Sequence, residues 1–324
     1  MILWRRIVNR KPRSHHGSPL DLAHDARVRA AAFAWLTEQV SRLGTDVFPH
    51  ALLAQGFQFA GDRVPLFAPQ GIFKPKVLSG APLSIRTAYG GPYDDAFGGD
   101  NLLRYRYRGT DPNHPDNVGL RTAMANRLPL VYLHGIAPAK YVVAWPVFVV
   151  GDDPVGLAVT VAVDDAEALP VGTSAGEVVR DDVATARRSY ITSLVRVRLH
   201  QRAFRERVLD AYQRQCAFCR LRHEELLDAA HIIPDAHPQG EPTVQNGLAL
   251  CSLHHSAFDA LFIGLRPDYV IEVREDILRE KDGPTLAHAI QGMHGKSILL
   301  PRTAAERPDP ARLEVRYEEF RRAS

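Results

Sequence analysis

The chain has 324 residues, of which 45% are hydrophobic and 24% are charged, and this predicts a globular protein of about two domains. Its formal net charge is only +3, so nucleic-acid binding has to rest on local clusters of charge. There is no apolar run long enough to span a bilayer, no secretory signal and too few cysteines for a disulfide framework, so we expect a cytoplasmic protein with no membrane partner.

The first half of the chain has the pattern of a β-rich domain. Residues 1–20 are expected to form a flexible arm, and residues 21–163 a β-rich recognition domain. Apolar residues recur every three or four positions over 25–44, which predicts a helix with Gly44 as its C-cap. Short apolar or alternating runs follow, broken by Gly, Pro, Asp and Asn, and predict strands, with one helix expected over 117–127.

An acidic stretch of small residues separates the two expected domains, and it predicts a linker over residues 164–188. The second domain is expected over residues 189–324 and begins with a helix. Residues 201–222 of that region hold six arginines against one glutamate and one aspartate. This excess of four positive charges favours a helix that lies along phosphates, and a solvated helix face is the alternative.

All three cysteines of the chain fall into one pattern with a histidine. Cys216 and Cys219 form a CxxC pair, Cys251 and His254 form a CxxH pair, and 31 residues separate the two pairs. Thiolates and imidazole hold Zn²⁺ tetrahedrally, so the pattern predicts a structural zinc site that stabilises a module with little apolar core of its own. The alternatives are buried free thiols and a redox-active CxxC, and no thioredoxin-like βαβ pattern supports the second.

Other residues in the same segment suit phosphodiester hydrolysis. His231 ends the strand-like run LLDAAHIIP, and an imidazole titrates near neutral pH, so His231 is predicted to be the general base. His255 and Asp259 lie four residues apart, on one face of an expected helix, where they can share a divalent cation such as Mg²⁺ or Mn²⁺. Asn246, in VQNGLAL, is expected to hold the base in place by hydrogen bonds across a turn.

The segments LLDAAHIIP, NGLAL and HHSAFD closely resemble the HNH, or ββα-metal, endonucleases, and the cysteine pairs resemble the zinc-containing subset of that family. The resemblance covers roughly residues 200–275. It implies that His231 is the general base, that Asn246 is a supporting residue and that His255 binds the catalytic cation.

One position departs from the family pattern. Many members have Asp or His directly before the base as a further metal ligand, and this chain has Ala230 there. Asp259 is our first choice for the second protein ligand, and Asp228 is the second choice.

The first domain is similar in its order of features to the SRA domains of the PUA-like superfamily. In chain order these features are Ser84, Gly90-Gly91, Tyr93-Asp94-Asp95, Tyr107-Arg108-Gly109, Asn117 and the segment 129–135. SRA domains flip a modified cytosine out of the duplex, stack it between aromatic rings and read it with a carboxylate. The resemblance therefore implies that Tyr93 and Tyr107 stack on the base and that Asp94 or Asp95 accepts its hydrogen bond.

Arginines in the same region are expected to face phosphates; they are Arg86, Arg104, Arg106 and Arg108. The alternative for the whole region is a β-hairpin with packed tyrosines and a polar Asp-Asp turn. Another modification, such as a sulfur-bearing backbone, is also compatible with it.

These patterns predict an α+β protein with an N-terminal β-rich PUA/SRA-like domain and a C-terminal ββα-metal HNH domain that carries a tail. The predicted function is cleavage of double-stranded DNA that contains modified cytosine, as a restriction or defence enzyme. The alternatives are an HNH nuclease with no modification requirement, a zinc-held DNA-binding module without cleavage, and an RNA target. Cutting both strands would bring two copies together, so a homodimer is a further expectation.

Overall fold

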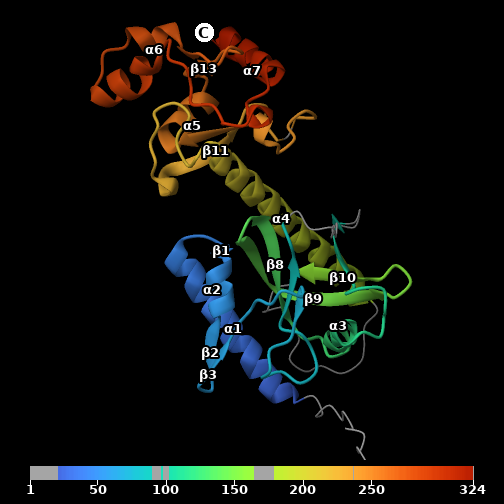
Figure 1. Ribbon diagram of the computed structural model, residues 1–324. Helices are drawn as coiled ribbons and strands as arrows, with labels where there is room; N and C mark the ends of the chain where they lie inside the picture. The colour runs from blue at the N-terminus through green and yellow to red at the C-terminus, as the bar shows by residue number, and fades with distance from the viewer. Residues whose placement is uncertain (1–20, 90–95, 98–101, 164–178, 236, 324) are drawn as a thin grey trace, which may run out of the picture.

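The computed structural model shows two domains joined by a long helix (Figure 1). It describes residues 21–89, 96–97, 102–163, 179–235 and 237–323. The expected arm and most of the expected linker lie outside the described residues. Within the described ranges, no helix combines the length and the apolar character that crossing a bilayer requires.

A sheet of eight strands forms the centre of the N-terminal domain, in the order β4-β5-β8-β9-β10-β7-β6, with β1 paired to β9. Strands β5 and β8 run parallel and the other pairs run antiparallel. The strands are β1 (Val47–Pro49), β4 (Ile72–Phe73), β5 (Ser84–Thr87), β6 (Ala96–Phe97), β7 (Leu103–Arg106), β8 (Leu130–Ala137), β9 (Lys140–Asp153) and β10 (Ala158–Val163). The short helix α2 (His50–Gln55) and the hairpin β2–β3 (Phe57–Phe59, Asp62–Val64) complete this part of the domain.

Helices cover both faces of this sheet because side chains along its strands alternate between the faces. Val131 and Leu133 of β8 belong to the apolar cluster of α1 (Leu22–Leu43). Leu130 and Tyr132 belong to a second cluster, together with residues of α3 (Pro115–Ala125) and α4. The predicted helices over 25–44 and 117–127 are confirmed, as is the β-rich character of this half of the chain.

Helix α4 (Val179–Ala211) belongs to both domains. Its 33 residues correspond to a length of about 50 Å. Leu199 and Ala203 lie in the N-terminal core, whereas Phe204 and Val208 lie in the C-terminal core. The predicted boundary between residues 188 and 189 falls inside this helix, because the acidic composition of the preceding segment does not show where the helix begins.

The C-terminal domain starts from a ββα unit. Strands β11 (Leu227–His231) and β12 (Gly247–Cys251) pair antiparallel and lead into α5 (Ser252–Asp259). Gly247 has a φ of −130°, so it is not a turn glycine. A Cβ atom there would lie 2.4 Å from Val208 and 2.9 Å from Phe204, so glycine allows α4 to approach the hairpin closely.

The rest of the chain wraps around this unit. It forms β13 (Ile263–Leu265), β14 (Ile271–Val273), α6 (Glu275–Arg279), an irregular helical segment over 285–293 and α7 (Pro310–Ala323). Leu299 N–H donates to Ala217 C=O at 2.8 Å, which ties the tail to the start of the domain. The expectation of little apolar core is wrong, because α4 and the tail extend one buried cluster from Phe204 to Leu313.

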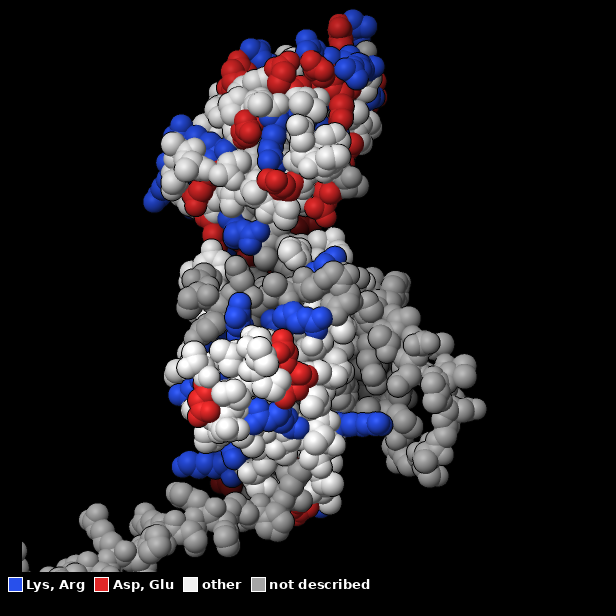
Figure 2. All heavy atoms as spheres, turned by 90° about the vertical axis from the view of Figure 1, so that its right-hand side faces the viewer, with Lys and Arg blue, Asp and Glu red and all other residues white. Residues whose placement is uncertain are grey.

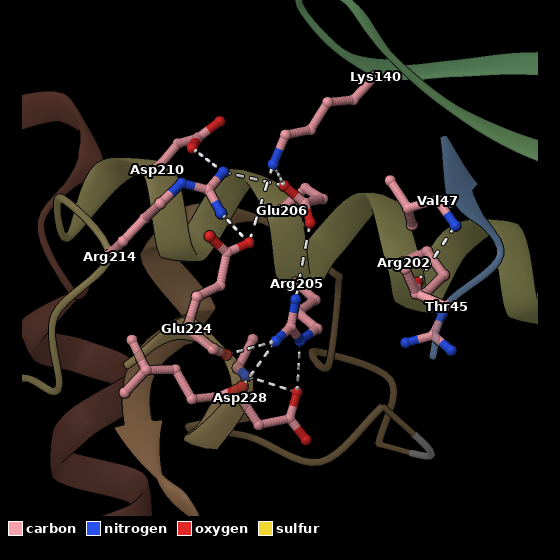
Figure 3. A network of polar contacts seen from close by, with 12 residues as sticks. Thr45, Val47, Lys140, Arg202, Arg205, Glu206, Asp210, Arg214, Glu224 and Asp228 are labelled. Carbon is pink, nitrogen blue, oxygen red and sulfur yellow. Dashed lines mark hydrogen bonds and ion pairs between the residues drawn. The ribbon is translucent and has the colours of Figure 1, made fainter. Parts of the chain in front are cut away.

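Ion pairs join the two domains where α4 leaves the sheet (Figure 3). Glu206 of α4 is 3% exposed, and its carboxylate contacts Lys140 of β9 at 2.6 Å and Arg214 at 3.0 Å. Burial alone raises the pKa of Glu206, but hydrogen bonds from these two cations outweigh burial, so the pKa lies below its ordinary value. Glu206 is therefore an ionised link between the sheet and the C-terminal domain.

Candidate active site and metal centre

The four predicted zinc ligands come together. Their ligand atoms lie within 4.8 Å of one another, with Cys219 Sγ 4.0 Å from Cys251 Sγ and Cys216 Sγ 3.5 Å from His254 Nδ1. Tetrahedral Zn²⁺ with bonds of about 2.3 Å to sulfur and 2.0 Å to nitrogen requires separations of about 3.5–3.8 Å. The donor types and the spacing are therefore compatible with a structural zinc site.

The imidazole of His254 is oriented for a ligand role. Its Nε2 lies 2.7 Å from the carbonyl oxygen of Ala289, so an Nε2–H donor leaves the Nδ1 lone pair facing the three sulfurs. Phe218 packs edge-on against the ring with centroids 5.4 Å apart. The carbonyl belongs to the tail, so the tail sets the orientation of this side chain.

His231 is the last residue of β11 and pairs with Gly247 across the hairpin. Its ring stacks on Phe204 of α4, with centroids 4.0 Å apart and planes at 20°. Its Nε2 is buried and has no hydrogen-bond partner among the described residues. Burial lowers the pKa of His231 and the nearby His255 adds to this, while Asp235 opposes it. The imidazole is therefore neutral near pH 7 and able to accept a proton.

Asn246 is fully buried, and its side chain forms hydrogen bonds with the loop that follows His231. We call this set of hydrogen bonds the Asn246 clasp. Its Oδ1 accepts from Ile233 N–H at 2.9 Å, and its Nδ2 donates to the carbonyls of Ile233 at 2.9 Å and Glu241 at 3.1 Å. Asn246 ends a single 3-10 turn (Val244–Asn246) directly before β12. One side chain thus satisfies three backbone groups beside the candidate base.

His255 lies on α5 between two carboxylates. Its Nε2 is 3.3 Å from Asp259 Oδ2, and its Nδ1 is 3.7 Å from Asp228 Oδ2. The side chains of Asp259 and Asp228 are 59% and 55% exposed, so both can reorient toward a ligand. An imidazole with carboxylates is a suitable donor set for Mg²⁺ or Mn²⁺. The two carboxylates face opposite ring nitrogens, so a cation on one nitrogen would have only one of them beside it.

Comparison with protein families agrees with this arrangement. A family model described as HNH endonuclease matches residues 216–266, which include the cysteine cluster, His231, Asn246 and His255.

This segment is an HNH endonuclease domain. The chain is therefore a nuclease. No curated protein matches the chain significantly. Among solved structures, a chain titled "Modification dependent TagI restriction endonuclease" is 15% identical, with a TM-score of 0.27, over 74% of this chain and 82% of that one.

The sequence did not indicate two neighbours of the HNH site. Phe204 supplies the plane on which His231 stacks, and Arg205 Nε lies 3.5 Å from Asp228 Oδ1. Both belong to α4, one helix before the HNH motif begins. A phenylalanine and an arginine on a helix carry no specific signal, so only the packing of α4 reveals these neighbours.

The predicted base-recognition residues are only partly described. Tyr93, Asp94 and Asp95 lie outside the described residues. Tyr107 is 3% exposed in the core, and its hydroxyl contacts Asp152 and, at 3.0 Å, Arg121. A stacking role for Tyr107 stays a prediction, and it requires the ring to leave this packing.

Several arginines expected at phosphates have partners inside the protein. In the N-terminal domain, Arg86 lies 4.8 Å from the ring centre of Phe67, and Arg108 pairs with Asp116 at 2.6 Å. Arg104 donates to Thr160.

Arg202 of α4 pairs with Asp46 at 2.9 Å, and Arg214, in the turn after α4, pairs with Glu206, Asp210 and Glu224. Intramolecular ion pairs thus offset much of the positive charge that the sequence places on this helix.

Proposed function

We propose that the protein is a modification-dependent endonuclease that hydrolyses double-stranded DNA carrying modified cytosine, as a restriction or defence enzyme. The HNH domain supports a cleavage activity. A separate β-rich domain, which shares helix α4 with it, supports recognition of the DNA at a distance from the bond that is cut. The observation that carries the proposal is the convergence at the HNH site, where a neutral His231 with an unpartnered Nε2 lies near a histidine bracketed by two carboxylates.

His231 acts as the general base in this proposal. It takes a proton from the water that attacks phosphorus, which requires a neutral imidazole with an available nitrogen. Stacking on Phe204 holds the ring plane, and the Asn246 clasp holds the backbone that follows it. His231 is therefore oriented from two sides, while its Nε2 has no hydrogen-bond partner among the described residues.

His255 would hold the catalytic Mg²⁺ or Mn²⁺ together with Asp259, or with Asp228. Such a cation stabilises the charge that develops on the phosphoryl and leaving oxygens. Cys216, Cys219, Cys251 and His254 would hold a structural Zn²⁺, which keeps α5 against the start of the domain. Adjacent residues of α5 point about 100° apart, so His254 and His255 can serve two different ions.

The modified-base reader would be the N-terminal domain. Its SRA-like order of features is supported by a contact between two of them, since buried Asn117 of α3 bonds both backbone groups of Arg108, at 2.9 Å and 3.1 Å. This ties the end of β7 to the helix that precedes β8. Tyr93, Asp94, Asp95 and Tyr107 remain the proposed base-recognition residues.

The test is cleavage of one plasmid prepared unmodified, with methylated cytosine and with hydroxymethylated cytosine, in the presence of Mg²⁺ or Mn²⁺. We expect cutting of a modified form only. Equal cutting of all three forms would leave an HNH nuclease without a modification requirement. No cutting of any form would favour another DNA mark or a binding module that does not cleave.

His231→Ala is the control in the same assay. Loss of a general base typically costs about 10²–10⁴-fold in rate, and the exchange should leave zinc content and DNA binding unchanged. Cleavage by His231→Ala at the wild-type rate would refute the assignment of the base.

A further inference from the structure

A cavity of about 660 Å³ opens beside His231 and is shared by the two domains. Its wall includes His134 of β8, one face of α4, and the loop after β11 that carries Asp235. His231 is thus reached through a space that the N-terminal domain helps to enclose. A cavity of this size is large enough for a nucleotide unit of a DNA strand.

The helix α4 presents cationic groups to this cavity in a row. Arg196, His200 and Arg207 line it, at positions i, i+4 and i+11 of the helix, which fall on one face. After burial, Arg196 and Arg207 are the next causes that lower the pKa of His200, so each of the two arginines lies near His200. Asp235 is the single carboxylate among the described lining residues.

Arg207 differs from other arginines of α4 in the type of group that its guanidinium contacts. Arg202 and Arg205 of the same helix have carboxylate partners, as the network in Figure 3 shows for Arg205. Arg207 Nη2 instead donates to the carbonyl of Pro242 at 2.9 Å, which carries no net charge. Burial lowers the pKa of Arg207, as expected for a cation that has no carboxylate partner in the part of the chain that the structure describes. A partly buried cation of this kind favours an anion beside it.

On the face drawn in Figure 2, acidic and basic side chains are mixed over the C-terminal domain, and no continuous basic surface appears there. With a net charge of only +3, the protein has to attract a polyanion through local clusters.

We infer that this cavity binds the phosphodiester backbone of the DNA strand next to the bond that His231 attacks, with Arg196 and Arg207 as its phosphate-binding residues. This inference rests on the proposed nuclease function. Guanidinium groups match phosphate oxygens in charge and geometry. Since α4 also forms part of the core of the N-terminal domain, a strand held there keeps a constant distance between reader and cut.

The experiment measures binding without cleavage. Full-length protein carrying His231→Ala is titrated onto a short fluorescent DNA duplex over a series of salt concentrations, with and without Arg196→Gln or Arg207→Gln. Each exchange is expected to weaken binding roughly tenfold and to reduce the slope of log K against log salt by about 1, as for one lost phosphate contact. The same shift is expected for unmodified and methylated duplexes, because phosphates carry no sequence information.

Two matched variants control the test. Arg198→Gln removes the same charge from a 61% exposed side chain of α4 that does not line the cavity, so its effect should be less than about twofold. Arg207→Lys keeps the charge and should recover most of the binding. Equal effects of Arg196→Gln, Arg207→Gln and Arg198→Gln, or no effect of the first two, would overturn the inference.

A separate cleavage assay distinguishes this inference from the proposed function. If the wild-type protein cuts DNA while Arg196→Gln and Arg207→Gln bind and cut normally, the inference fails and the function stands. If the wild-type protein cuts no DNA but the two variants lose binding as described, the binding cavity stands and the proposed function fails.

Discussion

The two domains hold their candidate functional residues in different ways. In the HNH domain these residues lie between Cys216 and Asp259, on short strands and one helix that contain the candidate zinc ligands and the Asn246 clasp. In the N-terminal domain the corresponding features lie on a sheet whose strands come from distant parts of the chain. A site of the first kind depends on a few polar contacts, and a site of the second kind depends on the sheet as a whole.

Loss of zinc should give the largest difference in stability between the HNH domain and the N-terminal sheet domain. Structural Zn²⁺ contributes about 10–16 kcal/mol in zinc-finger peptides, which matches or exceeds the whole stability of an ordinary domain. Cys216→Ser, or a strong chelator, is therefore expected to unfold the HNH domain and leave the sheet domain folded. Calorimetry and metal analysis check this, and normal stability of both domains without zinc would rule out the structural role.

Low pH should destabilise the N-terminal sheet domain because it favours protonation of His134. Burial, with His200 adding to it, lowers the pKa of His134 to about 4. The unfolded chain takes up this proton near pH 6.5 and the folded chain only near 4, so the free energy of unfolding falls as the pH drops between these values. The full loss is about 3 kcal/mol for this group.

His134→Asn isolates that contribution, because the amide can still contact the Tyr132 hydroxyl, which lies 2.9 Å from His134 Nδ1, and it does not titrate. Denaturant unfolding at pH 7 and below pH 5 should show a smaller pH dependence in the variant. An identical pH dependence in both proteins would show that His134 is not held neutral.

Asn246→Ala tests the clasp in the HNH domain. It leaves three backbone groups near His231 without their partner, and a buried unsatisfied group costs about 1–3 kcal/mol. We expect a loss of about 2–4 kcal/mol in the HNH domain and slower cleavage. Gln245→Ala is the matched control, since the neighbouring Gln245 is exposed and its side chain donates to the carbonyl of Ala305. Equal effects of the two exchanges would contradict the clasp.

The smallest effect that we expect is the difference in Mg²⁺ requirement between variants of the two carboxylates at His255. Asp259 Oδ2 is nearer to the ring than Asp228 Oδ2, at 3.3 Å against 3.7 Å, and Asp228 also faces Arg205. Asp259→Asn should therefore raise the Mg²⁺ concentration needed for cleavage roughly tenfold more than Asp228→Asn, a difference of about 1.4 kcal/mol. Titrating Mg²⁺ in the cleavage assay decides between them, and the opposite order would make Asp228 the main ligand.

Much of the HNH site was predictable because its signals are local. The four candidate zinc ligands, His231, Asn246 and His255 lie within about forty residues, and the spacing of CxxC, CxxH and the i, i+4 pair on α5 follows from local geometry. The helix over 25–44 was predictable for the same reason, since its apolar stripe and its C-cap Gly44 are properties of one segment.

The role of α4 was decided only by the tertiary structure. Nothing in its sequence marks where it passes from one core to the other between Ala203 and Phe204. Its arginines suggested a phosphate-binding face, but two of them, Arg202 and Arg205, face carboxylates of the protein itself. Gly247 likewise suggested a turn, but it allows α4 to approach β12. Ion pairs, aromatic stacking and close packing between distant segments depend on positions in space, and no short stretch of sequence contains that information.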